Sequence, residues 1–105
     1  RSIFTHVKLN IYPDGGVARI RIYGDMKINK LFSKKIINLT SILNGATPIA
    51  CNNEHFGRAE NVLAPGIGKN MGDGWETKRS RGKNFDWLIL KCAAAGKINK
   101  IQIEF

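Results

Sequence analysis

The chain has 105 residues, 43% of them hydrophobic, and 17 basic residues against 8 acidic ones give a formal net charge of +9. This length and composition fit one folded domain with a modest core and exclude a disordered chain. No apolar run approaches the roughly 20 residues of a membrane-spanning helix, and the first ten residues lack a signal-peptide pattern. Cys51 and Cys92 have no CxxC spacing, so we expect reduced thiols in a cytoplasmic or organelle-matrix protein.

The excess of positive charge favours an anionic partner, which could be a small acid, a phosphate compound or a nucleic acid. Most basic side chains, however, alternate with apolar residues, as they do on the solvent face of a half-buried sheet. The sequence has no zinc-finger spacing and no RNA-binding aromatic signature. Nucleic-acid binding therefore rests on charge alone, and we expect a small anion instead.

The first third of the chain contains two segments in which apolar and polar residues alternate. Residues 3–12 and 17–23 both have the period of a half-buried strand. The Pro-Asp-Gly-Gly sequence between them, residues 13–16, is strong turn chemistry. These segments together predict a β-hairpin. Residues 25–35 are basic and aperiodic, which indicates a linker or a surface crossing.

The middle of the chain has weaker patterns. The apolar spacing of residues 36–43 is closer to a short helix than to a strand, and Asn-Gly at 44–45 would end that helix. A short strand is expected at residues 48–51. Residues 52–84 are rich in glycine and asparagine and show little periodicity. A loop region of this length is uncommon in a compact domain and is usually functional.

The last part of the chain returns to strand patterns. Residues 85–92 predict a strand that is buried over most of its length, residues 93–96 a turn, and residues 98–105 a final alternating strand. The whole pattern predicts an all-β, mostly antiparallel β-sandwich with long loops. Because the chain begins and ends within strands, we expect it to be a fragment of a longer protein.

One stretch, NMGDGWETKRSR at residues 70–81, concentrates side chains that do chemistry or bind anions. These side chains are Asp73, Glu76, Lys78, Arg79 and Arg81. Glycines flank Asp73 and allow tight turns and close approach of a ligand to the backbone. Trp75 stands between the two carboxylates. The alternative is a solvated turn whose charges pair with one another.

Three stretches together resemble the allantoicase (allantoate amidinohydrolase) family: FTHVKLNIYPDGGVARIRIYG (4–24), NEHFGRAENVLAPGIGKNMGDGWETKRSR (53–81) and DWLILK (86–91). The resemblance implies tandem jelly-roll β-sandwiches of the galactose-binding-like type, assembled into a homo-oligomer. It also implies hydrolysis of allantoate to ureidoglycolate and urea in purine and allantoin breakdown.

The resemblance also implies a division of the chain into repeats. Residues 1–24 match the end of a first repeat, residues 25–35 form a linker, and residues 36–105 match an incomplete second repeat. Alternatively, the first segment completes the same sandwich in a permuted order. Asn52 and Asn53 stand where the family commonly has Ser-Asp, which removes one carboxylate.

For allantoate, an anion with two ureido groups on one carbon, the family resemblance assigns roles to the 70–81 stretch. The cations suited to the substrate carboxylate are Lys78, Arg79 and Arg81. Asp73 and Glu76 are the acid and base candidates, because two carboxyls in different surroundings can hold different protonation states. Trp75 would supply a dry wall that contacts substrate and raises one of their pKa values. Alternatively, either carboxylate binds backbone N–H groups in the loop.

Glu54 and His55 form a second candidate cluster. A histidine beside a glutamate can act as a base or a metal ligand, although it can also be a hydrogen-bonded residue at a loop edge. With only two histidines in the chain, no histidine-rich metal site can be built. A divalent-metal site completed by another subunit stays open. Phe85 and Trp87 are interpreted as core residues.

A second class of function is also consistent with the sequence. The lost carboxylate and the +9 charge fit a catalytically inactive member of the family. Such a protein would serve as a basic structural subunit or binding module in a larger assembly, which could contain RNA.

Overall fold

The computed structural model describes residues 3–12, 14–28, 31–55, 57–70, 72–79 and 85–105. The strands are β1 (Phe4–Ile11), β2 (Gly16–Val17), β3 (Arg19–Ile28), β4 (Leu31–Asn38), β5 (Thr47–Cys51), β6 (Trp75–Glu76) and β7 (Asp86–Glu104), and the two 3-10 helices are η1 (Ile42–Asn44) and η2 (Ala59–Leu63). Every strand pairing within the described residues is antiparallel. The predicted all-β, antiparallel fold class is confirmed. Within the same residues, no helix is long and apolar enough to cross a bilayer.

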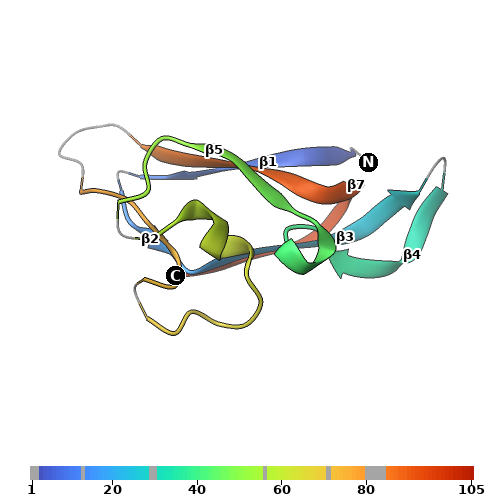
Figure 1. Ribbon diagram of the computed structural model, residues 1–105. Helices are drawn as coiled ribbons and strands as arrows, with labels where there is room; N and C mark the ends of the chain where they lie inside the picture. The colour runs from blue at the N-terminus through green and yellow to red at the C-terminus, as the bar shows by residue number, and fades with distance from the viewer. Residues whose placement is uncertain (1–2, 13, 29–30, 56, 71, 80–84) are drawn as a thin grey trace.

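The fold is arranged around β7, which is 19 residues long. Its first half pairs with β1 on one edge, where Asp86 lies opposite Ile11, and with β5 on the other edge, where Leu88 lies opposite Cys51. Its second half pairs with β3, which in turn pairs with β4. Figure 1 shows that β7 bends midway, so that β1 and β5 lie in one layer and β3 in the other.

The hydrophobic core lies between these two layers and beneath η2. Its buried members are Val17, Ile20, Ile22, Ala46, Ala59, Val62, Leu63, Trp75, Leu88 and Leu90. Even-numbered residues in the first half of β7 point into this core because side chains alternate along a strand. Asp86, the first of them, is therefore an inward-facing carboxylate at the end of the core.

Two glycines permit a close approach of β3 and β7 near the bend. A Cβ atom at Gly24 would overlap the carbonyl oxygen of Lys97, and one at Gly96 would lie 2.5 Å from the carbonyl oxygen of Asp25. Each Cβ would also crowd Leu39 Cδ1, at 2.8 and 3.2 Å respectively. Only glycine fits where two backbones come this close.

The predicted hairpin of the first two strands is wrong. β1 and β3 form as expected, but each pairs with β7 and neither pairs with the other. The chain between them crosses from one layer to the other, as Figure 1 shows. Turn residues specify that a chain changes direction, whereas the choice of a strand's partner depends on β7, which lies about 80 residues further along the sequence.

Three further local expectations are wrong. Residues 25–28 continue β3 and residues 31–35 begin β4, where we expected a linker. Residues 36–38 are strand, and the only described helical turn of the expected helix is η1. Residues 93–96 continue β7 without a break, where we expected a turn. Tertiary pairing overrides weak local patterns in each case.

Other local expectations are confirmed. The strand expected at residues 48–51 is β5. Gly45 ends η1 with φ at +106°, a left-handed conformation that favours glycine.

Candidate functional site

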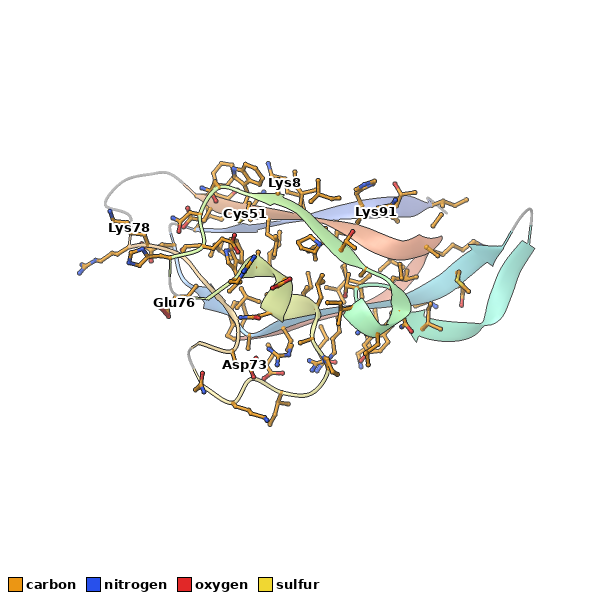
Figure 2. The ribbon with its side chains drawn as sticks, viewed as in Figure 1. Lys8, Cys51, Asp73, Glu76, Lys78 and Lys91 are labelled. Atoms are coloured by element: carbon orange, nitrogen blue, oxygen red, sulfur yellow. The ribbon has the colours of Figure 1, made fainter. Side chains whose placement is uncertain are left out.

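The chain around β6 is held between two neighbouring segments at one end of the sandwich, where Figure 2 labels Glu76 and Lys78. On one side, β6 pairs with β2. On the other side, the His55 N–H donates to the Glu76 carbonyl at 3.0 Å, and the Glu76 N–H donates to the Gly57 carbonyl at 3.4 Å. The Lys78 N–H donates to Asn53 Oδ1 at 3.0 Å. The structure thus brings the two clusters predicted from sequence alongside each other.

Side chains alternate along this segment. Trp75 and Thr77 are buried, Glu76 is half-buried and Lys78 is exposed. Glu76 and Lys78 therefore leave the chain on the same, outer side, with their Cα atoms about 7 Å apart. Thr77 fixes the segment, because its Oγ1 accepts a hydrogen bond from the Gly15 N–H at 3.1 Å.

The two tryptophans differ in environment. Trp75 is 0% exposed in the core, and its Nε1–H donates to the Asn53 carbonyl at 2.7 Å. Trp87 is only half-buried and Phe85 is exposed, so the prediction that both are core residues is wrong. Lys8 Nζ lies 5.5 Å from the ring centroid of each. Residues 85–92 are apolar at nearly every position, so their pattern could not tell the inner face from the outer.

Asp73 contacts Arg19 and Lys69 and is separate from the residues around Glu76 and Lys78. Its Oδ1 lies 3.0 Å from Arg19 Nη2 in an ion pair, and its Oδ2 accepts the Lys69 N–H at 3.1 Å. The Lys69 hydrogen bond and then the Arg19 guanidinium hold the pKa of Asp73 below its usual value. Figure 2 shows Asp73 in the lower loop, away from Lys78 at the left end of the sandwich. This arrangement favours a structural role for Asp73.

We expect acid to weaken the fold through Asp73 and Glu104. The Gly68 N–H, and then Arg21, lower the pKa of Glu104 in the same manner. Folding lowers both pKa values, so the stabilisation is complete above the unfolded pKa values of about 4 and is lost as the pH falls through the folded ones. Urea denaturation would measure the free energy of unfolding at about pH 5 and about pH 2. The decrease between these pH values should be smaller in the double variant Asp73→Asn, Glu104→Gln than in the unmodified protein. Equal losses in both proteins would contradict this assignment.

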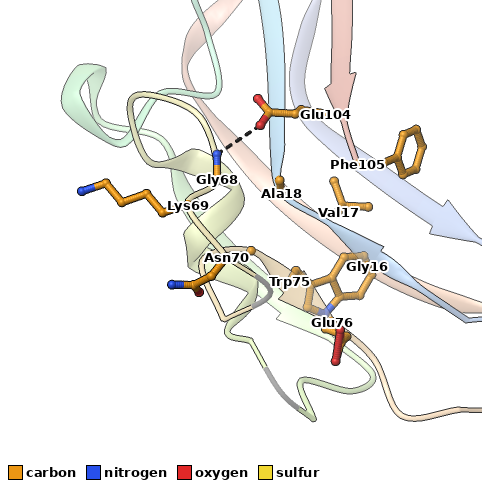
Figure 3. Close-up of a pocket in the computed structure, with 11 residues that line it drawn as sticks. Gly16, Val17, Ala18, Gly68, Lys69, Asn70, Trp75, Glu76, Glu104 and Phe105 are labelled. Atoms are coloured by element: carbon orange, nitrogen blue, oxygen red, sulfur yellow. Dashed lines mark hydrogen bonds between the residues drawn. The ribbon is translucent and has the colours of Figure 1, made fainter.

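The side chains of the other sequence candidates have different surroundings. Glu54 Oε2 accepts the Ala59 N–H at 2.7 Å at the start of η2, which favours a structural role. His55 is exposed. Arg81 lies outside the described residues. Glu76 has no recorded hydrogen bond or ion pair from its carboxylate to any described residue, and it lines the hollow of about 450 Å³ in Figure 3.

A second, polar hollow of about 450 Å³ lies at the same end of the sandwich. Its lining residues are Asn52, Asn53, Lys78, Arg79, Phe85, Asp86 and Trp87. Lys78 and Arg79 are exposed cations, whereas Asp86 is 5% exposed. The segment from Trp75 to Arg79 borders both hollows. The second hollow combines positive charge at its surface with a buried acceptor, which suits a small anion that also carries N–H groups.

Asn52 positions the Asp86 carboxylate. Asn52 Oδ1 accepts the Trp87 N–H at 2.9 Å, the Asn52 N–H donates to the Trp87 carbonyl at 3.3 Å, and Asn52 Nδ2 donates to Asp86 Oδ1 at 2.9 Å. Sequence reasoning missed both residues. The available signal was a lone carboxylate at the start of an apolar strand.

Metal and redox chemistry have few candidate groups here. Among the residues that the structure describes, no three His, Cys, Asp or Glu side chains are grouped as they would be around a metal ion. Cys51 and Cys92 are free thiols, and burial raises the pKa of each.

Comparison with known proteins identifies the family. The family model described as the allantoicase repeat matches residues 1–27 and 37–105. Probable allantoicases of Acinetobacter baylyi and Acinetobacter baumannii are 52% and 50% identical over 103 residues, which are 98% of this chain and 31% of each relative. That of Photobacterium profundum is 48% identical over 105 residues, which are 32% of its length. The chain thus spans about a third of these relatives, and no solved structure matches it. It belongs to the allantoicase-repeat family.

Proposed function

We propose that the protein is an allantoicase-like hydrolase, which converts allantoate and water to ureidoglycolate and urea. The observation that carries the proposal is the identity of about half its residues, across 98% of the chain, to relatives named probable allantoicase. The hollow bordered by Lys78 and Arg79 supports it, because cations at the surface of a small polar hollow suit a small carboxylate substrate.

The reaction assigns distinct tasks to the site. Water forms a bond from its oxygen to the central carbon of allantoate, one C–N bond to that carbon breaks, and the departing nitrogen gains a proton to leave as urea. Arg79 and Lys78 bind the carboxylate, and Glu76 transfers a proton. Glu76 fits this task better than Asp73, because the Asp73 carboxylate is engaged by Arg19 and by the Lys69 N–H.

Further features of the family belong to this proposal. The two-layer sandwich is a galactose-binding-like jelly roll that spans the end of one repeat and most of the next, and the protein works as a homo-oligomer. Residues 28–36, which the family model does not match, fall in β3 and β4 and the segment between them. The free thiols agree with a cytoplasmic enzyme of purine breakdown.

Urea release from allantoate tests the proposal. Arg79→Ala should raise KM by about 10- to 100-fold, because a charge-assisted hydrogen bond contributes about 1.5–3 kcal/mol. Arg58→Ala is the matched control, since Arg58 is also an exposed arginine, with a 3.6 Å ion pair to Glu60. No release by the folded protein would contradict the proposal and support the inactive structural subunit.

A further inference from the structure

The buried end of the polar hollow contains an incompletely satisfied carboxylate. Asp86 is 5% exposed, and its Oδ1 accepts a hydrogen bond from Asn52. Its Oδ2 is buried and has no hydrogen-bond partner among the described residues. A buried polar atom without a partner destabilises a fold, so such atoms in native proteins need an explanation.

The position of Asp86 suggests a ligand as that explanation. Leu88 and Leu90, which point into the same layer interface from β7, belong to the hydrophobic core. Asp86 is at the end of this row and is one of the residues that line the hollow. Asn52 holds the carboxylate in place, and Asn52 is itself fixed by two hydrogen bonds to the Trp87 backbone.

The chemistry of the hollow defines the ligand class. An ionised carboxylate only accepts hydrogen bonds, so Oδ2 requires an N–H or O–H donor. Lys78 and Arg79, at the exposed side of the same hollow, require an anion. A ureido group attached near a carboxylate offers both: N–H donors at one end and negative charge at the other.

We propose that Asp86 is a ureido-binding residue, and that the hollow selects N-carbamoyl acids by pairing Asp86 Oδ2 with the ureido N–H groups and Lys78 and Arg79 with the ligand carboxylate. This inference rests on the proposed function, because it deepens the substrate class of the same site. Asn52 is a positioning residue in this arrangement, since it acts by orienting Asp86.

Two probe ligands test the inference without turnover. N-carbamoylglycine carries a terminal NH₂ group where N-acetylglycine has a methyl group of similar size. By calorimetry, the unmodified protein should bind N-carbamoylglycine about 10- to 100-fold more tightly than N-acetylglycine. This factor corresponds to the free energy of one hydrogen bond to a charged acceptor, which N-acetylglycine cannot form at that position. Equal affinities in the unmodified protein would overturn the inference, whatever any variant does.

Variants then identify the residue that causes the preference for N-carbamoylglycine over N-acetylglycine. Asp86→Asn keeps an acceptor for Asn52 but replaces the other oxygen with a donor, so it should remove most of the preference between the two probes. Arg79→Ala should weaken both probes by the same factor and keep the preference. Asp25→Asn, on β3 and away from the hollow lining, is the matched control and should change neither. An undiminished preference in folded Asp86→Asn would contradict the role of Asp86.

The outcomes also separate this inference from the proposed function. Urea release from allantoate together with equal binding of the two probes would retain the hydrolase and reject the Asp86 site. A strong preference for N-carbamoylglycine without urea release would retain the binding site and reject the hydrolase.

Discussion

Replacing Glu76 with glutamine is expected to lower kcat for urea release from allantoate by about two to four orders of magnitude, the usual contribution of a general acid or base. Glutamine keeps the size of the side chain and its place on β6 but cannot transfer the proton. Glu76 leaves the chain on the same side as Lys78, and its carboxylate has no recorded partner among the described residues. Steady-state kinetics with allantoate would measure the effect.

The control for this substitution is Glu60→Gln. Glu60 is half exposed on η2, with a 3.6 Å contact to Arg58, and should leave kcat unchanged. A kcat of Glu76→Gln within about twofold of the unmodified protein would show that another group transfers the proton. KM should change little, since Lys78 and Arg79 provide the attraction for the substrate carboxylate.

Trp75→Ala is expected to lower the free energy of unfolding by about 3–5 kcal/mol, as large-to-small substitutions of buried aromatic residues do. Trp75 is the largest of the fully buried side chains, and its indole N–H bonds the Asn53 carbonyl. The substitution would leave a cavity beneath β6 and an unpaired carbonyl. Chemical denaturation of both proteins would measure the loss.

Trp87→Ala is the matched control, because it removes the same side chain from a half-buried position on the outer face. Its loss of stability should be less than half as large, since the energy scales with the area removed from water. Equal losses for the two variants would contradict the assignment of Trp75 to the core.

Local pattern predicted the strongly alternating strands but neither the weakly patterned ones, such as β4, nor the strand pairing. The alternation of residues 3–12 correctly predicts that Val7, Leu9 and Ile11 pack against the core. The predicted hairpin fails because both of its strands pair with β7, and such long-range competition leaves no local signal. The close approach of β3 and β7 likewise requires two glycines, Gly24 and Gly96, that lie far apart in the sequence.

The candidate site was predictable only in part. Alternation along an extended segment puts Glu76 and Lys78 on one side, although Glu76 lines the hollow of Figure 3 and Lys78 lines the polar hollow. Sequence proximity also grouped Asp73 with these residues. In the structure, however, the Asp73 carboxylate forms an ion pair with Arg19. The contact between Asn52 and Asp86 joins residues 34 positions apart and forms only when β5 and β7 pair.

Amide chemical shifts during titration with N-carbamoylglycine would test the central claim, that a ureide binds at the end of the sandwich formed around β6 and the start of β7. We predict saturable shifts at the N–H groups of Lys78 and Trp87, both of which line the polar hollow. Shifts confined to Gly68 and Lys69, in the hollow of Figure 3, or no saturable shifts at all, would contradict it.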